Sequence, residues 1–314
     1  MTLQQLVYFL AVARTRHFTK AAELTRVAQP SLSKQIHSLE KELGAPLFSR
    51  ARGNIALTPA GEALLPLAER ILSDVDTARL EVQELVGLKQ GRVRVGATPS
   101  LCVSLFADVL KRFHDSYPGI ELIIQENGSR DLVNALLRGE LDLALVISSV
   151  EGTGGALTNT PILRESLVVA APADADVPTR RGNLRLTDLR ERQLVMFREG
   201  YDLRETTMSA CRDAGFHPRF AVLGGEMDAV LRLVEAGLGM AIVPSMVLAA
   251  RPLLRGIPLA PPGMSRTITL AHRTDVAPTN AARAFRTALV DFLNQASLPE
   301  GVLLVDQRST RVTT

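Results

Sequence analysis

Apolar and polar positions between residues 17 and 28 follow the helical period and then lose it, which predicts a short helix and a tight turn. Thr19 is expected to cap this helix, because a threonine hydroxyl can accept a hydrogen bond from an unpaired N–H of the first turn. Residues 25–28 are too few and too mixed for another element, so they form the turn. The predicted buried face of the helix holds Ala21, Ala22 and Leu24.

A second helix is predicted over residues 29–43. Proline is tolerated at Pro30, because the N–H that it lacks has no partner in a first helical turn. The predicted buried positions are four, three and four residues apart, at Leu32, Ile36, Leu39 and Leu43. The other face carries short polar or cationic groups that suit phosphates and base edges. These candidate DNA-binding residues are Gln29, Pro30, Ser31, Ser33, Lys34, Gln35 and His37. Two helices so arranged predict a DNA-binding helix-turn-helix whose second helix recognises the duplex.

The segments on either side complete this predicted domain. A helix over residues 3–15 presents one apolar stripe, formed by Leu3, Leu6, Val7, Leu10 and Ala13. After Gly44, the stretches LFSR and IALT have strand character, and residues 52–54 have the composition of a turn, which predicts a small hairpin wing. Arg50 and Arg52 on this wing are further candidate DNA contacts.

A long helix is predicted over residues 59–88, starting from a threonine cap at Thr58 and proline at Pro59. Pro66 in its early turns is expected to bend it. Apolar residues then alternate four and three apart, which is a heptad seam that predicts pairing with a second copy of the chain. The predicted dimer seam consists of Leu64, Ala68, Ile71, Val75, Ala78, Val82 and Leu85.

Beyond residue 91 the pattern changes to strands and helices in alternation, which predicts parallel sheets covered on both faces. The strands are expected at 92–96, 120–126, 141–147, 166–171, 193–197, 220–223, 240–243 and 268–272. The helices are expected at 100–116, 131–138, 202–214, 227–236 and 279–295. Two such sets in series suggest two α/β subdomains with a crevice between them. Residues after Leu298 have little apolar pattern and are expected to form a tail.

A resemblance to a known family is carried by the run AAELTRVAQPSLSKQIHSLEKELGAPLFSRARGNIALTPAG and its lead-in LQQLVYFLAVARTRHFT. Both resemble the N-terminal domain of a LysR-type transcriptional regulator. The matching positions include Phe9, Ala21, Ala22, Leu24, Gln29, Pro30, Ser33, Ile36, Leu39, Glu40, Gly44, Leu47, Phe48, Arg50, Leu57, Thr58 and Gly61. Further along, GELDLALV and LVEAGLGMAIVP resemble phrases of the family's regulatory domain.

The resemblance implies an α+β multi-domain protein. A winged helix-turn-helix at 1–58 and a linker helix at 59–90 would precede a periplasmic-binding-protein-like α/β effector domain at 91–298. Subdomain I would hold residues 91–161 and 266–298, subdomain II residues 162–265, and residues 299–314 would be the tail. The chain would cross between subdomains near Pro161 and Ser265. The implied partners are double-stranded DNA, a small-molecule effector and further copies of the chain, in a dimer through the linker helix and a tetramer of two dimers. RNA polymerase is a further candidate partner.

Two turns that join a strand to a helix are the candidate effector site. The first is GATPS, and the second contains Ser129; ligands in α/β sheets bind beyond the carboxyl ends of the strands. Plain helix capping is the alternative role of these turns, and the family resemblance favours a ligand. Helix N-termini, hydroxyls and a guanidinium would suit an anion such as an organic acid, although Glu126 and Glu226 oppose it. The candidate residues on these turns are Thr98, Pro99, Ser100 and Ser129. Further candidates from the second predicted subdomain are Phe197, Arg198, Gly200, Gly225 and Glu226.

Charge supports the DNA-binding hypothesis through its distribution. The whole chain carries a net charge of only +3. Residues 1–60 hold eight Lys and Arg against three Glu, a balance of +5, and residues 61–90 hold three against six Asp and Glu, a balance of −3. The cationic excess therefore coincides with the predicted helix-turn-helix, where contact with phosphates is expected.

Other functions are less well supported by the sequence. No phosphate-binding loop, zinc-protease helix or GxSxG elbow occurs, and the five histidines lack metal-ligand spacing, so we expect no enzyme, no metal and no cofactor. Cys102 and Cys211 are expected to be buried structural residues, and a thiol redox sensor on the same scaffold is the alternative. A solute-binding or enzymatic domain fused to an adaptor is a second alternative. Without a signal peptide, a membrane span or a disulfide framework, the expected location is the cytoplasm.

Overall fold

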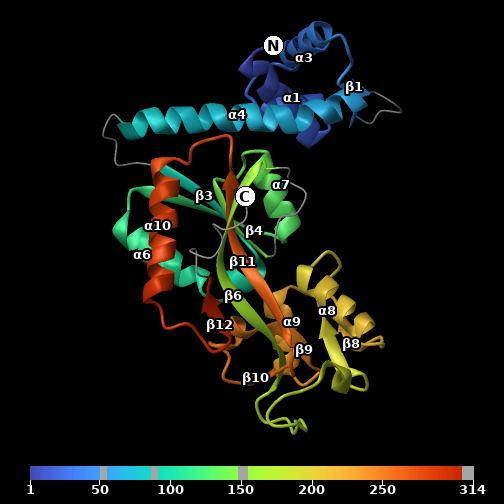
Figure 1. Ribbon diagram of the computed structural model, residues 1–314. Coiled ribbons are helices and arrows are strands. Elements are labelled where there is room, and N and C mark those ends of the chain that lie inside the picture. The colour runs from blue at the N-terminus through green and yellow to red at the C-terminus, as the bar shows by residue number, and fades with distance from the viewer. Residues whose placement is uncertain (50–54, 86–90, 148–154, 306–314) are drawn as a thin grey trace. The chain divides into compact units, whose positions relative to one another are not determined.

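The computed structural model describes residues 1–49, 55–85, 91–147 and 155–305, and it divides into two compact units. The first unit holds residues 1–88, and the second holds most of the remainder. The helices and strands of the first unit are α1 (Leu3–Thr15), α2 (Phe18–Leu24), α3 (Gln29–Leu43), β1 (Phe48–Ser49), β2 (Ala56–Leu57) and α4 (Pro59–Leu85) (Figure 1).

Helices α1, α2 and α3 pack around one hydrophobic core and confirm the predicted helix-turn-helix. The cap of α2 was wrongly predicted: Nδ1 of His17, and not Thr19, accepts the hydrogen bonds from the first-turn amides. The buried faces are also narrower than expected. Leu24 is 70% exposed and Leu43 is 43% exposed, because both lie at the last positions of their helices and extend past the core.

Helix α1 buries a different stripe from the predicted one. Leu6 and Leu10 are buried as expected, whereas Leu3 is 41% exposed. Residues from the neighbouring rows of the helix complete the buried side, since α1 contacts α2, α3 and α4 and therefore needs a wide apolar face. The buried residues are Gln5, Leu6, Tyr8, Phe9, Leu10 and Val12.

The predicted wing is a short antiparallel hairpin of β1 and β2, in which Phe48 pairs with Leu57. Glu40 joins α3 to this hairpin, because its Oε1 accepts hydrogen bonds from the backbone N–H groups of Leu47 and Phe48, at 2.8 and 3.3 Å. The ring of Phe48 packs on Phe9 and Phe18. The tip of the wing, with Arg50 and Arg52, lies outside the described residues.

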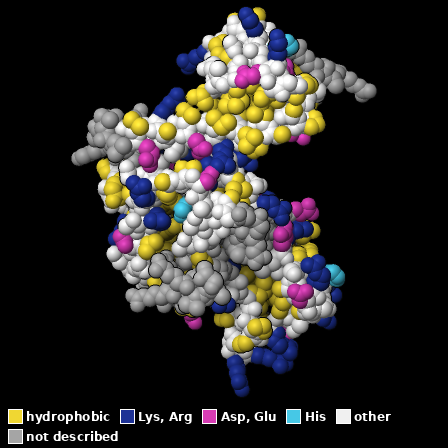
Figure 2. Space-filling model, turned by 45° about the horizontal axis from the view of Figure 1, so that its top comes forward, with side chains coloured by type: hydrophobic (Ala, Val, Ile, Leu, Met, Phe, Trp, Pro, Cys, Tyr) yellow, Lys and Arg dark blue, Asp and Glu magenta, His cyan; other side chains and the backbone are white. Residues whose placement is uncertain are grey.

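Helix α4 begins at Pro59 as predicted and contains Pro66. The first part of the predicted seam belongs to the core of the same chain: Ala68 is fully buried there, and Leu64 and Ile71 pack against that core. Farther along, Val82 is 61% exposed, and Leu67, which the heptad pattern did not include, is 55% exposed. Figure 2 shows hydrophobic side chains gathered on one face of this unit. The side chain of Leu85 is not among those described.

The elements of the second unit alternate between strands and helices (Figure 1). The strands are β3 (Gly91–Ala97), β4 (Ile120–Glu126), β5 (Leu143–Ile147), β6 (Leu157–Pro172), β7 (Gln193–Met196), β8 (Arg219–Leu223), β9 (Ala241–Pro244), β10 (Leu254–Pro258), β11 (Met264–Arg273) and β12 (Val302–Leu304). The α-helices are α5 (Pro99–Cys102), α6 (Phe106–Ser116), α7 (Ser129–Leu137), α8 (Asp202–Asp213), α9 (Met227–Glu235) and α10 (Asn280–Gln295), with 3-10 turns η2 (Leu186–Leu189) and η3 (Ser245–Leu248).

The predicted parallel pairing is confirmed for some strands and wrong for others. Strands β3, β4 and β5 pair in parallel, as do β7 and β8. The two long strands β6 and β11 are antiparallel to each other, and β11 is antiparallel to β5. Together they join both halves of the unit into one mixed sheet of order β10-β6-β11-β5-β3-β4, with β9 and β12 also paired to β6. A chain that leaves one subdomain and returns must cross twice in opposite directions, which accounts for the antiparallel pair.

Two hydrophobic cores lie in this unit, as expected for two subdomains. One packs α6 and α10 against β3, β5 and β11, with the rings of Phe113 and Phe285 in edge contact at 5.2 Å. The other packs α8 and α9 against β6, β7 and β9. The helix predicted over 100–116 is divided into α5 and α6. Residues 299–305 are not a plain tail, because β12 pairs with β6 and buries Val302.

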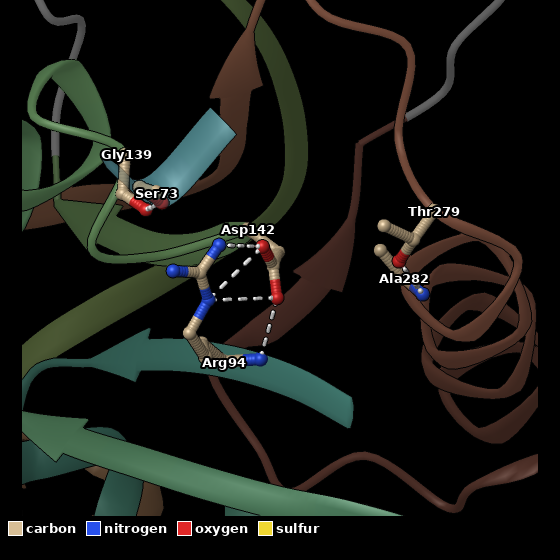
Figure 3. A network of polar contacts seen from close by, with 6 residues as sticks. All are labelled: Ser73, Arg94, Gly139, Asp142, Thr279 and Ala282. Atoms are coloured by element: carbon tan, nitrogen blue, oxygen red, sulfur yellow. Dashed lines mark hydrogen bonds and ion pairs between the residues drawn. The ribbon is translucent and has the colours of Figure 1, made fainter. Parts of the chain in front are cut away.

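Polar contacts fix the ends of elements in the first of these cores. The guanidinium of Arg94 on β3 faces the carboxylate of Asp142, whose Oδ2 also accepts a hydrogen bond from the Arg94 backbone N–H at 2.7 Å (Figure 3). Thr279 caps α10 by accepting a hydrogen bond from the N–H of Ala282. The contact between Arg94 and Asp142 holds β3 beside β5, and so fixes the turn that follows β3.

Candidate DNA interface and effector cavity

The recognition face of α3 is open to solvent along the predicted positions. Leu32 and Ile36 point into the core, whereas the polar side chains between them are exposed or half-buried. Lys34 is exposed and has no ion-pair partner among the described residues. The exposed and half-buried residues are Gln29, Pro30, Ser31, Ser33, Lys34, Gln35 and His37.

Some of these polar groups are already oriented by neighbours. Nε2 of Gln29 donates to Oγ of Ser33 at 2.9 Å, which positions two candidate base-reading side chains relative to each other. Gln35 accepts a hydrogen bond from the buried Gln5, which ties it to α1. Ser33, Lys34 and His37 also line a hollow of about 470 Å³ beside the wing, together with Phe18, Ile36, Glu40, Pro46 and Phe48. The helix therefore presents a preorganised polar edge.

A cavity of about 100 Å³ lies between the two cores of the second unit. The turn after β3 contributes three of the predicted residues to its wall, Thr98, Pro99 and Ser100. Helix α8 contributes residues from its start, and strand β11 contributes Arg266, none of which was predicted. The residues from the start of α8 are Asp202, Leu203 and Thr206, and the remaining lining residues are Gly128, Ile147, Leu167, Tyr201 and Ser265.

Arg266 is the central charged group of this wall, and it is 7% exposed. Its Nη1 donates to Oγ of Ser100 at 2.8 Å, and its Nε donates to Oε2 of Glu165 at 2.9 Å. Glu165 is fully buried, and its second oxygen accepts the backbone N–H of Met246 at 2.8 Å. Arg266 and Glu165 are paired in register on the antiparallel strands β11 and β6, so the cross-strand geometry brings the ions together.

Tyr201 and Asp202 form the opposite wall, where α8 begins. The Tyr201 ring stacks on Phe197, with centroids 4.6 Å apart and planes 9° apart. Burial raises the pKa of Tyr201, with a smaller lowering by the charge of Arg266, so its hydroxyl stays protonated and can donate. Oδ2 of Asp202 accepts a hydrogen bond from Oγ of Ser129 at 2.5 Å.

Several predicted effector residues do not line this cavity. Ser129 lies behind the wall and joins Asp202 to the backbone N–H of Ile147. The ring of Phe197 stacks on the ring of Tyr201. Arg198 forms an ion pair with Glu226, so the guanidinium that was expected to attract an anion is already neutralised. Gly200, Gly225 and Glu226 are likewise not part of the lining.

Some of the missed residues had a signal in the sequence. Arg266 is the single charged residue of the stretch MSRTITLA, a pattern that indicates a paired or functional group, whereas Glu165 directly follows Arg164 and gave no comparable signal. Their partnership spans 101 positions, which local periodicity does not report. Tyr201 and Asp202 stand at the start of the predicted helix at 202–214 and could have been added as helix-start residues facing the crevice.

Both thiols are protonated at neutral pH. Burial and the nearby carboxylate of Glu126 raise the pKa of Cys102 to about 12, and burial raises the pKa of Cys211 to about 11. Cys211 is fully buried in the core that contains α8, and Cys102 packs against the core that contains α6. Among the described residues, neither cysteine forms a disulfide.

Comparison with known proteins identifies the family. Residues 3–62 match the family described as bacterial regulatory helix-turn-helix protein, lysR family, and residues 87–294 match the LysR substrate binding domain. The chain is 30% identical to the transcriptional dual regulator GltC of Bacillus subtilis, over 94% of this chain and 98% of that protein. It is 31% identical to a probable hydrogen peroxide-inducible genes activator of Streptomyces viridosporus, over 92% and 95% of the two chains.

Solved structures resemble the whole chain. A full-length OxyR variant from Pseudomonas aeruginosa has a TM-score of 0.70 at 26% identity, covering 98% of this chain and 99% of that one. CbnR complexed with its target DNA has a TM-score of 0.67 at 25% identity, covering 92% and 98%. The chain therefore belongs to the LysR family, and it is a DNA-binding transcriptional regulator with an effector-binding domain. Within the described residues, no helix has the length and apolar character of a membrane span.

Proposed function

We propose that a small molecule bound in the cavity lined by Ser100, Tyr201, Asp202 and Arg266 controls transcription by this regulator. The observation that carries the proposal is the buried Arg266, which reaches Ser100 from a strand that joins the two cores. A ligand that contacts both walls would favour one relative arrangement of the subdomains. In an oligomer, that arrangement would change the spacing of the DNA-binding domains.

Ser100→Ala is expected to weaken binding of the effector by about 0.5–3 kcal/mol, because it removes a hydroxyl from the wall and leaves Arg266 with one partner fewer. The ligand is first found by thermal-shift screening of the full chain against cytoplasmic metabolites, and its affinity is then measured by calorimetry. Ser104→Ala is the matched control, since that hydroxyl donates to the carbonyl groups of Ser100 and Leu101 and does not line the cavity. Equal affinity in the wild type and Ser100→Ala would contradict the site.

The DNA contacts are proposed to come from the exposed face of α3 and from Arg50 and Arg52 of the wing. Lys34→Ala is expected to weaken duplex binding by roughly 1–3 kcal/mol, because it removes a cation from the centre of the recognition face. Lys41→Ala removes an exposed cation from the last turn of the same helix and is expected to have a smaller effect. Footprinting and titration with the operator duplex measure both, and equal losses would contradict this docking of α3.

Oligomerisation is proposed to occur through the exposed part of α4, and the assembly to be a dimer or a tetramer of two dimers. The support is the apolar exposure of Leu67 and Val82 on a 27-residue helix. We further propose that the protein has no enzymatic activity and acts in the cytoplasm, where its target DNA lies, with RNA polymerase as a partner.

A thiol redox switch is the second candidate function, because relatives include proteins named hydrogen peroxide-inducible genes activators. Such chemistry requires a thiolate nucleophile. The raised pKa values of about 12 for Cys102 and about 11 for Cys211 leave very little thiolate at neutral pH. Effector binding is therefore the better-supported control mechanism for this chain.

A further inference from the structure

Two buried donors at the proposed effector cavity make no hydrogen bond within the described residues. The hydroxyl of Tyr201, a residue 5% exposed, is the first. Nη2 of Arg266 is the second: it is ion-paired with Oε2 of Glu165 at 2.8 Å, but too obliquely for a hydrogen bond. Both residues line the cavity. Unsatisfied buried donors are costly, so an acceptor from a ligand would be strongly favoured there.

The other wall carries the carboxylate of Asp202, which lies in the first turn of α8, where a helix N-terminus favours negative charge. Asp202 lines the cavity and accepts a hydrogen bond from Ser129, but within the described residues it has no ion-pair partner. The charge of Arg266 does not compensate it, because Arg266 is already paired with the fully buried Glu165. The charges of Arg266, Glu165 and Asp202 together leave one net negative charge at the cavity.

We infer that the effector is a small zwitterion that carries a carboxylate and a protonated amine, as a small α-amino acid does. This inference rests on the proposed function, that the effector binds in this cavity. The ligand carboxylate accepts hydrogen bonds from Tyr201, from Nη2 of Arg266 and from the Thr98 and Ser100 hydroxyls. The ligand ammonium donates to the carboxylate of Asp202.

A ligand that carries only one charge fits this cavity less well than a zwitterion does. A plain organic anion would accept hydrogen bonds from these two donors, but it would lie next to the negative charge of Asp202. A plain amine would match Asp202 and leave the Tyr201 hydroxyl and Nη2 of Arg266 without a hydrogen bond. The volume of about 100 Å³ is well below that of most ligand pockets, which restricts the ligand to a few non-hydrogen atoms.

The test compares matched probes on the full chain by calorimetry. Glycine, alanine and serine are the zwitterions; acetate, propionate and 3-hydroxypropionate lack the amine; methylamine, ethylamine and ethanolamine lack the carboxylate. We expect at least one of the three amino acids to bind about tenfold or more tightly than its deaminated and decarboxylated counterparts. If none of the amino acids binds, or if propionate binds as well as alanine, the inference is overturned.

Two conservative variants test which residue binds the ammonium of the ligand and which binds its carboxylate. Asp202→Asn keeps an acceptor for Ser129 but removes the charge. We therefore expect this variant to bind the amino acid about tenfold or more weakly, and to bind propionate as well as the wild type does or better. Tyr201→Phe removes only the hydroxyl that makes no hydrogen bond, and it should weaken the binding of both the amino acids and the carboxylates without an amine. Glu226→Gln is the control, because that carboxylate pairs with Arg198 outside the lining.

These outcomes separate the ligand class from the location of the site. If the ligand that binds lacks an amine, is sensitive to Ser100→Ala and Tyr201→Phe, and is unaffected by Asp202→Asn, the zwitterion inference fails and the cavity stands. If an amino acid binds and is insensitive to all three variants, the cavity itself is the wrong site and the proposed function fails with it.

Discussion

Replacing Arg266 by methionine is expected to lower the free energy of unfolding of the effector domain by about 3–5 kcal/mol. The substitution leaves the carboxylate of Glu165 uncompensated, because that side chain has no access to water and Arg266 supplies the only charge that faces it in the described residues. The same substitution removes the hydrogen bond to Ser100. The loss should therefore exceed that expected from deleting a surface cation, which is usually under about 1 kcal/mol.

The double variant Glu165→Gln with Arg266→Met distinguishes an uncompensated charge from a loss of packing. Glutamine keeps an acceptor for the N–H of Met246 and carries no charge, so most of the lost stability should return. Urea denaturation of the wild type, Arg266→Met and the double variant measures this, with Arg164→Met as a surface control on the neighbouring strand position. A double variant as unstable as Arg266→Met would show that the guanidinium matters through packing instead.

Replacing Val82 by glutamate is expected to weaken the dimer by about 3 kcal/mol or more, which is a factor of more than about a hundred in dissociation constant. Val82 is 61% exposed in the single chain, and its heptad position places two copies in one apolar layer of a paired helix. Two carboxylates in that layer would lose water and repel each other. Val82 is a better probe than Ile71, because Ile71 also packs against the core of its own domain.

Sedimentation velocity across a range of protein concentrations measures the dimer directly. Thr77→Glu adds the same charge to another face of α4 and should leave the oligomer intact. Circular dichroism of Val82→Glu should match that of the wild type, since the side chain is exposed in the single chain. If Val82→Glu sediments as the wild type does, the predicted seam is not the dimer interface.

The helix-turn-helix domain was largely predictable because its signals are local. The turn at residues 25–28, Pro30 at the start of α3, and the four-three spacing of Leu32, Ile36 and Leu39 all lie within one short stretch. Predictions failed at the margins of this stretch. Leu24 and Leu43 belong to the apolar period but lie past the edge of the core, and the cap of α2 comes from the His17 ring.

The cavity proposed to bind the effector was predictable only in part, on the side that a strand-to-helix turn identifies. Thr98 and Ser100 line it as expected, since ligands bind beyond the carboxyl ends of strands in such sheets. Arg198 was a reasonable cation to choose from its position, but Glu226 neutralises it. No local pattern distinguishes a guanidinium that faces a cavity from one that is already paired.

Local signals in the sequence were enough to predict the helix-turn-helix, the long α4, the two sets of strands and helices, and the family, because each depends on periodicity, caps or motifs within a few turns of chain. Which residues form the cavity depends instead on contacts between distant parts of the chain. Strands β6 and β11 run antiparallel between the two cores, and their register brings Glu165 to Arg266, and Arg266 to Ser100, across 101 and 166 positions. Such contacts are set by strand pairing and burial, which the order of neighbouring residues does not encode locally.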